Sequence, residues 1–600
     1  MDNYWQELTN KRLSRRRAIQ ATAATGLAAA ALSLIGCGGG DSDKGGPKDS
    51  SGLLGKKADA TKDAVRGGTW QSYRDEDVIS LNPLVNTQGA AQSELIWAYS
   101  MLVKHGFAVD RNVGAEAIAG DAAESWEISP DATQITLKLR PNLKLDPRPP
   151  TNGRNVTVQD VKYSWDTAEK TSPYRPSLFN SASPAGPIKT VETPDASTIV
   201  IKMAFPYAPV LEILGHQQHP LIVPIEADGK FNANAEMRGS GPFMLTQYQQ
   251  SSRFDYERNP NYYVKDRPLF DKVTKPIITD YAAALAQFES KAIWGDVTNT
   301  IVKPEDVLRV KRAHPEMVML SELRPSGYIS QKIYNFSKQP ASPLADVRVR
   351  RAFSMTLDRD LYIDAIEGVE KFRKEGLPVD TAWNSHLAAY FPSWIDPRDE
   401  KEMGEGAKYF KHDPGDAKKL LQAAGHTGKV KFPWGYYTDR GTEHTKINEI
   451  VVGMAVDSGL FEITLEPLPY ASTWRDVCQG SNGDGFSGGC YNSADGFNED
   501  AYLVNVYTPQ GKFATASKPI PGFTDLVLKS RTEPDAHKRS ELIKEIQRKA
   551  AMEMHYLPIP GRSLGFTLRW PWLKNHGIYE RGGATAREFT EAWFDAKLRT

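Results

Sequence analysis

Several features that mark common classes of protein are missing from this 600-residue sequence. It contains three cysteines, too few for a framework of many structural disulfides. Lys and Arg number 74, and Asp and Glu also number 74, so the chain lacks the excess positive charge that nucleic-acid binding needs. Apart from one run near the N-terminus, no long apolar stretch occurs. The rest of the sequence therefore offers no candidate membrane span.

Motifs of familiar enzyme classes are absent from the sequence as well. We find no Gly-x-Ser-x-Gly, no His-Glu-x-x-His and no phosphate-binding loop. The stretch from His216 to His219 holds two histidines without further ligands at metal-binding spacing, and Pro220 follows directly. We therefore expect a structural role for it and predict no metal site and no cofactor. A catalytic acid and base that only the fold brings together would leave no recognisable motif in the sequence.

The one apolar run lies at the extreme N-terminus and ends at a cysteine. Arg15, Arg16 and Arg17 precede residues 21–35, which carry no charge, and glycines follow Cys37. A charged start before a short apolar region is typical of a secretory signal, and the run is too short for a permanent span. The arginines resemble the twin-arginine export signal, although Ala18 stands where an aromatic residue is preferred.

The end of this run, residues 34–37, reads Leu-Ile-Gly-Cys and resembles the bacterial lipobox. We therefore predict a signal peptide over residues 1–36 and a lipid on Cys37 that anchors an extracytoplasmic protein to the membrane. The alternative is an ordinary buried helix with an incidental cysteine. Residues 37–66, which are rich in Gly, Ser, Asp, Lys and Ala, are predicted to form a flexible tether.

Strand and helix patterns alternate along the remainder, which is too long for one hydrophobic core. Strands are predicted from alternating apolar residues at 135–139, 199–203 and 254–258. Helices are predicted after four capping residues, and again over 536–552 from its apolar spacing. The capping residues are Thr157, Asp346, Asp358 and Asp413. This alternation favours an α/β architecture.

Cys478 and Cys490 remain once Cys37 is assigned to the signal, and they bracket a glycine-rich stretch. Outside the cytoplasm such a pair is a candidate disulfide. The alternative is two reduced cysteines, each buried as a small apolar side chain.

Five further segments carry recognisable motifs: 67–84, 122–165, 239–263, 346–359 and 413–425. Together they resemble the extracytoplasmic solute-binding proteins of family 5, the peptide, dipeptide and nickel receptors of ABC importers. They occur in family order and span most of the chain beyond the tether. One departure is a longer, proline-rich loop over 145–153, and another is the partial match at 334–336.

The resemblance implies a two-lobed periplasmic-binding-protein fold with a hinge and an additional small inserted domain. It also implies that a peptide or other small solute is bound by hinge closure and passed to the transmembrane subunits of an ABC permease. The alternative is an extracytoplasmic hydrolase of peptides or glycans. Carried onto this chain, lobe I comprises 67–105, 190–325 and 555–600, the inserted domain 106–189, and lobe II 326–554.

In peptide-binding members of the family, an Asp of lobe II takes the α-amino group of the ligand, and Asp495 has the matching spacing. A partly desolvated carboxylate is a strong, charge-assisted partner for an ammonium group. Alternatively, Asp495 caps a turn beside Gly496, or Asp500 competes for the role. Tyr491 and Asn492 are further candidate contacts with the ligand. The alternative is that they pack in the core. Trp474 and Tyr328 are candidate cleft walls.

Overall fold

The computed structural model describes residues 49–599, apart from several internal stretches. The stretches left out are 86–88, 110–117, 208, 217–218, 296–300, 322–330, 337–340, 390, 439–441, 480–485, 495–497, 510–519 and 582–586. The predicted signal peptide and Cys37 lie outside the described residues. Among the helices that are described, none has the length and apolar character required to cross a membrane.

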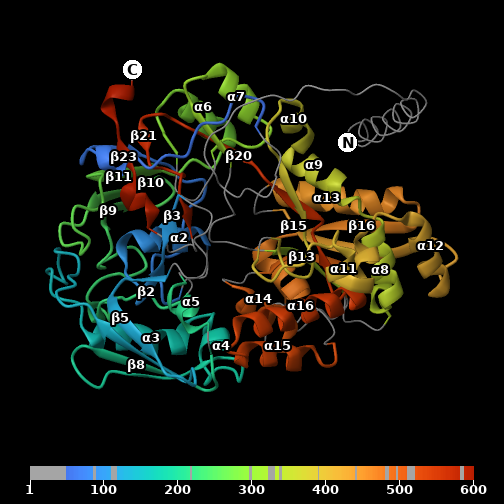
Figure 1. Ribbon diagram of the computed structural model, residues 1–600, viewed down its shortest axis with the longest axis horizontal. Coiled ribbons are helices and arrows are strands. Elements are labelled where there is room, and N and C mark those ends of the chain that lie inside the picture. The colour runs from blue at the N-terminus through green and yellow to red at the C-terminus, as the bar shows by residue number, and fades with distance from the viewer. Residues whose placement is uncertain are drawn as a thin grey trace, which may run out of the picture. The chain divides into compact units, whose positions relative to one another are not determined.

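Lobe I is built on a four-stranded sheet with the order β1-β11-β10-β9 (Figure 1). Its first two strands are parallel and the others antiparallel. The helix α2 (Gly89–Ala98) packs on β9 and brings Trp97 into the core, where its ring stacks on Phe589 with centroids 4.2 Å apart. The C-terminal residues thus complete this lobe. The strands are β1 (Thr69–Gln71), β9 (Phe243–Gln249), β10 (Arg253–Arg258) and β11 (Lys272–Pro276).

A second four-stranded sheet, with the order β5-β6-β8-β7, forms the inserted part and is antiparallel throughout. The predicted alternation is confirmed, because Ile135 and Leu137 are buried. The helix α3 (Val158–Thr171) begins with the predicted capping box and packs on β7. The sheet continues past residue 189, where we expected the insert to end. Its strands are β5 (Ala123–Ile128), β6 (Gln134–Leu139), β7 (Ile188–Glu192) and β8 (Thr198–Met203).

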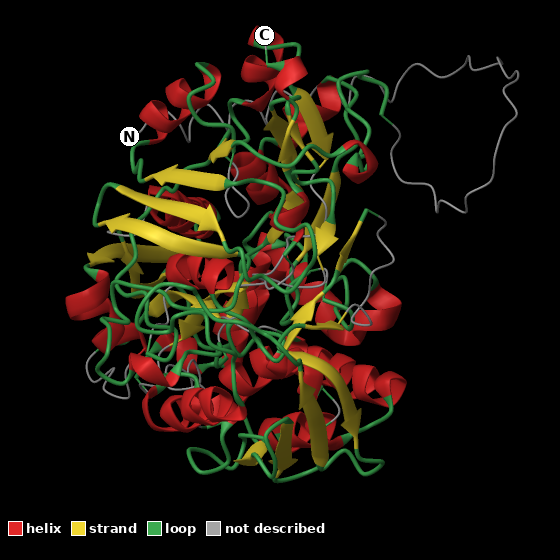
Figure 2. Cartoon of the chain, turned by 90° about the vertical axis from the view of Figure 1, so that its left-hand side faces the viewer, coloured by secondary structure: helices red, strands yellow, loops and turns green. Residues whose placement is uncertain are grey.

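Lobe II is built on a five-stranded sheet with the order β16-β15-β17-β13-β18. β15 is parallel to both β16 and β17, whereas β13 is antiparallel to its neighbours. Helices and strands are interleaved along this part of the chain. Figure 2, viewed from the side of the lobe I sheet and the inserted part, shows a similar mixture of helices and strands there. The strands are β13 (Gln331–Phe336), β15 (Val430–Tyr437), β16 (Phe461–Leu468), β17 (Gly489–Ala494) and β18 (Leu557–Pro558).

The helices of lobe II begin where the sequence predicts them. The carboxylates of Asp346, Asp358 and Asp413 each accept a hydrogen bond from a backbone N–H in the first turn of the helix that follows, which satisfies a donor that the helix itself leaves unpaired. The helices are α8 (Val347–Met355), α9 (Arg359–Glu367), α12 (Pro414–Ala423), α13 (Thr442–Asp457), α14 (Glu499–Tyr507), α15 (Phe523–Thr532) and α16 (Ala536–Glu553).

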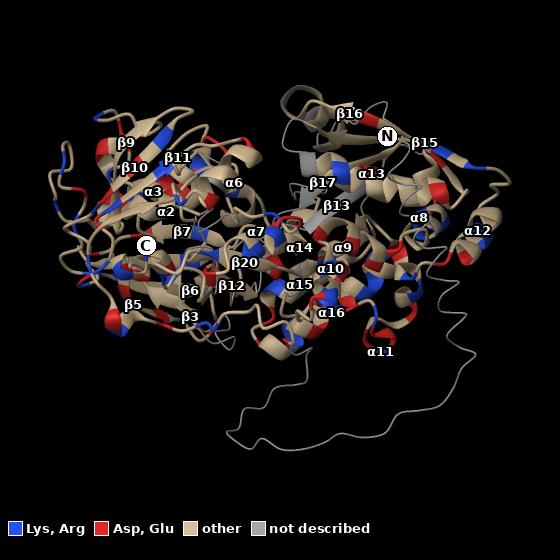
Figure 3. Ribbon diagram, turned by 90° about the horizontal axis from the view of Figure 1, so that it is seen from above, with Lys and Arg blue, Asp and Glu red and all other residues tan. Residues whose placement is uncertain are grey.

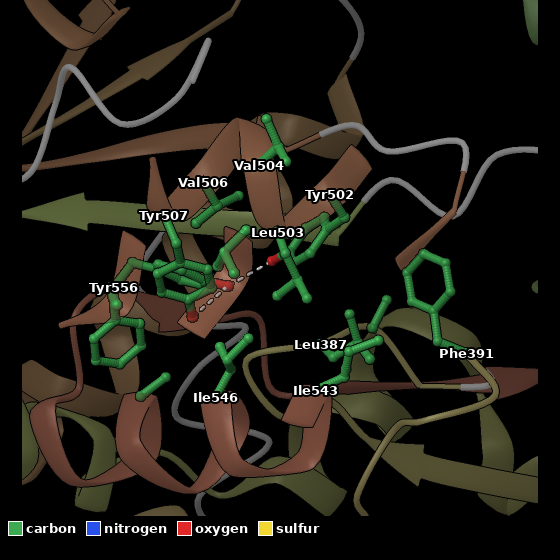
Figure 4. Packing of buried hydrophobic residues seen from close by; sticks show 14 of the residues in the cluster. Leu387, Phe391, Tyr502, Leu503, Val504, Val506, Tyr507, Ile543, Ile546 and Tyr556 are labelled. Carbon is green, nitrogen blue, oxygen red and sulfur yellow. Dashed lines mark hydrogen bonds between the residues drawn. The ribbon is translucent and has the colours of Figure 1, made fainter. Parts of the chain in front are cut away.

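The core of lobe II between α14, α15 and α16 combines apolar packing with three buried tyrosines (Figure 4). The hydroxyls of Tyr502 and Tyr556 lie 2.6 Å apart, and Tyr507 donates to the Tyr556 hydroxyl over 3.2 Å. Tyr556 donates in turn to the backbone oxygen of His386. Each buried phenol hydroxyl therefore has a hydrogen-bond partner, so its burial does not destabilise the core. Ala185 of the inserted part belongs to the same cluster.

Two of the places at which the described chain passes between the lobes lie side by side. β12 (Val318–Ser321) precedes the crossing into lobe II, and β20 (Phe566–Arg569) follows the return. The two strands pair antiparallel, Val318 opposite Arg569 and Ser321 opposite Phe566. β18 (Leu557–Pro558) still belongs to the lobe II sheet, so the return lies beyond residue 555, the position at which we expected it. Just before the return, β19 (Gly561–Leu564) pairs with β14 (Asp380–Trp383). A two-stranded connection of this kind is narrow enough to serve as a hinge.

The smaller elements complete the described fold. Three further strand pairs, β2-β4, β3-β22 and β21-β23, are all antiparallel. The remaining elements are β2 (Val103–His105), β3 (Phe107–Ala108), β4 (Ile118–Gly120), α4 (Arg175–Leu178), α5 (Val210–Leu214), α6 (Tyr281–Glu289), α7 (Val307–Ala313), α10 (Val369–Lys374), α11 (Glu400–Met403), β21 (Leu573–Lys574), β22 (Glu580–Arg581) and β23 (Trp593–Phe594), with short 3₁₀ turns between them.

Candidate functional site at the edge of the lobe II sheet

Three parallel strands of lobe II end at the same edge of the sheet. β15 ends at Tyr437, β16 at Leu468 and β17 at Ala494. In open α/β sheets, ligands bind in the crevice outside the carboxyl ends of parallel strands. Asp495 follows β17 directly in the sequence, but it lies outside the described residues, as does Tyr328.

Aromatic side chains gather at this edge. Tyr437 is at their centre, with ring centroids 4.6 Å from His444, 5.0 Å from Trp474 and 5.3 Å from Tyr491. Tyr470 stacks on Trp474 at 5.1 Å. Trp474 and Tyr491 are 1% and 0% exposed, whereas His444 and Tyr470 are only half-buried. We call these five residues the aromatic wall.

Hydrogen bonds fix the rings of the aromatic wall relative to one another. The Tyr491 hydroxyl and His444 Nδ1 lie 3.0 Å apart. The indole N–H of Trp474 donates to the backbone oxygen of Tyr491 over 3.1 Å. One strand, β17, thus holds both the helix α13, which carries His444, and the π-helical segment η5 (Tyr470–Gln479), which carries Trp474.

A disulfide also joins η5 to β17. Cys478 of η5 is bonded to Cys490 of β17, with Cα atoms 5.7 Å apart. Both residues are buried. On the neighbouring strand β15, Gly435 lies against the bond, because a Cβ placed there would come within 3.3 Å of either sulfur. A side chain at this position would therefore have to displace Leu468 or the disulfide slightly.

The structure brings together two of the predicted site residues, Trp474 and Tyr491, and places both inside the wall. Asn492 is also buried, so these side chains shape the site from behind its surface. Tyr437, His444 and Tyr470 were not predicted. The aromatic-rich run from Phe432 to Tyr437 was the available signal for the first of them.

Asp500, the competitor of Asp495, is occupied by other partners. Its carboxylate is 2.9 Å from Arg531 Nε and accepts a hydrogen bond of 2.6 Å from the Tyr207 hydroxyl. All three residues are buried. Burial and then the negative charge of Asp500 raise the pKa of Tyr207 well above its ordinary value, so this hydroxyl remains a donor.

The two histidines of residues 216–219 lie in the interior next to β2. Their rings are 5.5 Å apart, and His105 of β2 is close by. Burial lowers the pKa of His105 and of His219 to about 4. The three imidazoles are therefore neutral near pH 7 and belong to the packed interior.

Charges of both signs are interspersed along the elements of the described chain (Figure 3). The described residues form a two-lobed α/β protein, in which a connection at β12 and β20 lies between the lobe I sheet and the lobe II sheet with its aromatic wall. The family model for bacterial extracellular solute-binding proteins, family 5, matches residues 117–514. The chain belongs to this family.

Two relatives agree with this assignment. The dipeptide-binding protein of Escherichia coli is 24% identical over 505 residues, covering 78% of this chain and 84% of that protein. A putative ABC transporter peptide-binding protein of Brucella ovis is 31% identical over 262 residues, covering 42% of this chain and 45% of that protein.

Two solved structures establish the two-lobed fold. The periplasmic binding protein DppA of Helicobacter pylori, in complex with the peptide STSA, has a TM-score of 0.69 at 18% identity and covers 89% of this chain and 99% of its own. NikA of Brucella suis, in complex with Fe(III)-EDTA, has a TM-score of 0.69 at 18% identity and covers 88% of this chain and 100% of its own. The predicted fold class is confirmed.

Proposed function

We propose that this protein is the solute-binding component of an ABC importer and captures a peptide-like solute between its lobes. The observation that carries the proposal is the aromatic wall at the carboxyl edge of the lobe II sheet, where β17 ends at Ala494. Asp495 is the next residue in the sequence. The names of the relatives in E. coli and Brucella support a peptide ligand. The fold alone does not choose one, since neighbours hold a peptide and an iron chelate.

In the proposed complex, the Asp495 carboxylate binds the α-amino group of the ligand. Asp500 is unsuited to this role because it is buried and already paired with Arg531 and Tyr207. The aromatic wall would keep water away from the ion pair on one side, which strengthens a charge-assisted hydrogen bond. Closure about the connection at β12 and β20 would then bring lobe I onto the ligand.

Native mass spectrometry of the purified protein identifies the class of solute that it carries. Titration calorimetry with free and N-acetylated di- and tripeptides then tests the site. We expect Asp495→Asn to weaken binding of the free peptides by about 10- to 100-fold, the range of one hydrogen bond to a charged group. Binding of N-acetylated peptides, already weak, should not change.

A matched control is Asp525→Asn, an Asp near the start of α15, which should bind like the wild type. Unchanged affinity of Asp495→Asn for a free peptide would contradict the site. If no peptide binds and another solute is carried, the ligand class is wrong. Appearance of cleaved peptide would instead indicate a hydrolase.

We also propose that Cys37 carries a lipid that holds the protein on the outer face of the membrane, with residues 37–66 as the tether. A single acyl chain binds membranes weakly, so a stable anchor needs more than one chain. We expect the wild type in the membrane fraction of its natural host and Cys37→Ser in the soluble fraction. A variant that stays with the membrane would refute this anchor.

A further inference from the structure

A buried polar network joins the inserted part and the segment that follows it to lobe II. Tyr207, which follows β8, donates to Asp500 of α14 over 2.6 Å. Arg531 of α15 is paired with Asp500 at 2.9 Å and also donates to the backbone oxygen of Ala185. Its guanidinium lies 5.1 Å from the centre of the Tyr207 ring. Elements of the two sides are neighbours here, as α4 and α14 show in Figure 1.

A second contact involves residues close to the first in the sequence of each side. The amide nitrogen of Asn498 donates to the Glu212 carboxylate of α5. The orientation of this amide is fixed, because its oxygen caps α14 by accepting from the Ala501 N–H over 2.8 Å. Asn498 therefore presents a donor, and only a donor, toward Glu212. We call the residues of both contacts the interlobe network: Ala185, Tyr207, Glu212, Asn498, Asp500 and Arg531.

The composition of the interlobe network is suited to a contact that opens. Asp500 and Arg531 both belong to lobe II, so their ion pair persists when the sides separate. Opening therefore leaves no buried charge of this pair without its partner, a situation that would be strongly unfavourable. Tyr207, Asn498 and Glu212 exchange their bonds for water, and the net loss per bond is small. A wholly apolar interface would resist opening in proportion to its area.

We infer that the interlobe network is a latch that favours the closed arrangement before any ligand arrives, with the Asn498–Glu212 bond as its adjustable part. The inference rests on hinge closure, as proposed above, but on no particular ligand. The apparent affinity of a binding protein is reduced by the fraction of molecules in the binding-competent state. A latch of this kind therefore sets affinity from outside the ligand site.

The decisive variant is Asn498→Asp. It keeps the size and the capping oxygen of Asn498, but it turns the donor into a carboxylate that faces the Glu212 carboxyl. We expect ligand-free small-angle scattering of the mature protein to show a larger radius of gyration than the wild type. Adding Glu212→Gln restores a donor and an acceptor with their sides exchanged, and should return the radius to the wild-type value.

Two further variants separate the latch from general damage. Tyr207→Phe removes one network bond and should expand the ligand-free protein as well. Tyr256→Phe is its matched control, because the Tyr256 hydroxyl donates to Glu94 over 2.6 Å within lobe I, between buried residues. This control should leave the radius unchanged. Circular dichroism confirms that each variant is folded.

The inference is overturned if Asn498→Asp and Tyr207→Phe both fold and scatter like the wild type. It is also overturned if Glu212→Gln fails to reverse the expansion, or if Tyr256→Phe expands the protein equally. None of these outcomes depends on finding the ligand, so failure of the peptide proposal is distinguishable from failure of the latch.

Discussion

Glu499, the first residue of α14, is a group whose replacement should stabilise the protein. Burial raises the pKa of its carboxyl to about 7, and the nearby Glu212 carboxyl adds to the rise. Hydrogen bonds from the backbone N–H and the hydroxyl of Ser393 act in the opposite direction. The position at a helix N-terminus also favours the charged form, yet burial is the larger effect.

The magnitude follows from the difference between the folded and unfolded pKa. An ordinary glutamate titrates at 4.5, and each pKa unit corresponds to 1.36 kcal/mol. Below pH 4.5 both states hold the proton and nothing is lost. As pH rises from 4.5 to about 7, the unfolded chain releases its proton first, so stability falls. Above pH 7 the loss is constant at about 3 kcal/mol.

Glu499→Gln removes this loss because the side chain is neutral at every pH. The amide oxygen can still accept from the Ser393 N–H, and the amide nitrogen can donate to the Ser393 hydroxyl oxygen. We therefore expect the free energy of unfolding to rise by about 3 kcal/mol at pH 8 and to be nearly unchanged at pH 4.5.

Urea unfolding of the mature protein at pH 4.5, 6 and 8 measures this difference. Glu405→Gln, at an exposed glutamate beside α11, is the matched control and should lie within about 0.5 kcal/mol of the wild type at each pH. A gain of equal size at pH 4.5 and 8, or no gain at pH 8, would refute the reasoning.

Three further changes test the described structure by urea unfolding. Gly435→Ala should lower the free energy of unfolding by about 1–3 kcal/mol, since its Cβ would press on Leu468 and on both sulfurs of the disulfide. An unchanged urea midpoint would mean that the surrounding side chains can accommodate the methyl group. Asp413→Ala should cost about 1 kcal/mol at pH 7 through loss of the α12 cap, and Asp413→Asn should recover most of it. His105→Gln should lose less stability than the wild type between pH 7 and 4. Burial lowers the pKa of His105 in the folded protein, so as pH falls the unfolded chain binds a proton first and the wild type loses stability until the folded pKa is reached. Parallel curves of stability against pH for the two proteins would contradict this.

The elements whose signals are local could be predicted from the sequence. Asp413 caps α12 because a carboxylate, a proline and an apolar spacing lie within one helix. The strand at residues 135–139 was visible because period-two burial is written into adjacent residues. The order of the lobe II sheet could not be predicted, since β13 pairs with β17 and β18, which follow it by more than 150 residues. Such long-range strand pairings cannot be inferred from the spacing of residues in the sequence.

The candidate site shows the same limit. Trp474 and Tyr491 were singled out one at a time, but the contact between them depends on a disulfide and on a glycine of another strand. The choice between Asp495 and Asp500 was open in the sequence because both are acidic residues near one strand. Asp500 becomes the weaker candidate only when the structure shows it paired with Arg531 and Tyr207, which are distant from it in the sequence.

The stretch from Cys490 to Asp500 links the two halves of the proposed mechanism. Its first residues hold the aromatic wall through the disulfide and Tyr491, and its last residues hold the interlobe network through Asn498 and Asp500. Asp495 lies between them, three residues before the α14 cap. A ligand that fixes Asp495 therefore acts on a short segment, whose other end is anchored in the interlobe network. Because coupling between binding and closure is reciprocal, weakening the latch should lower ligand affinity without altering any residue that touches the ligand.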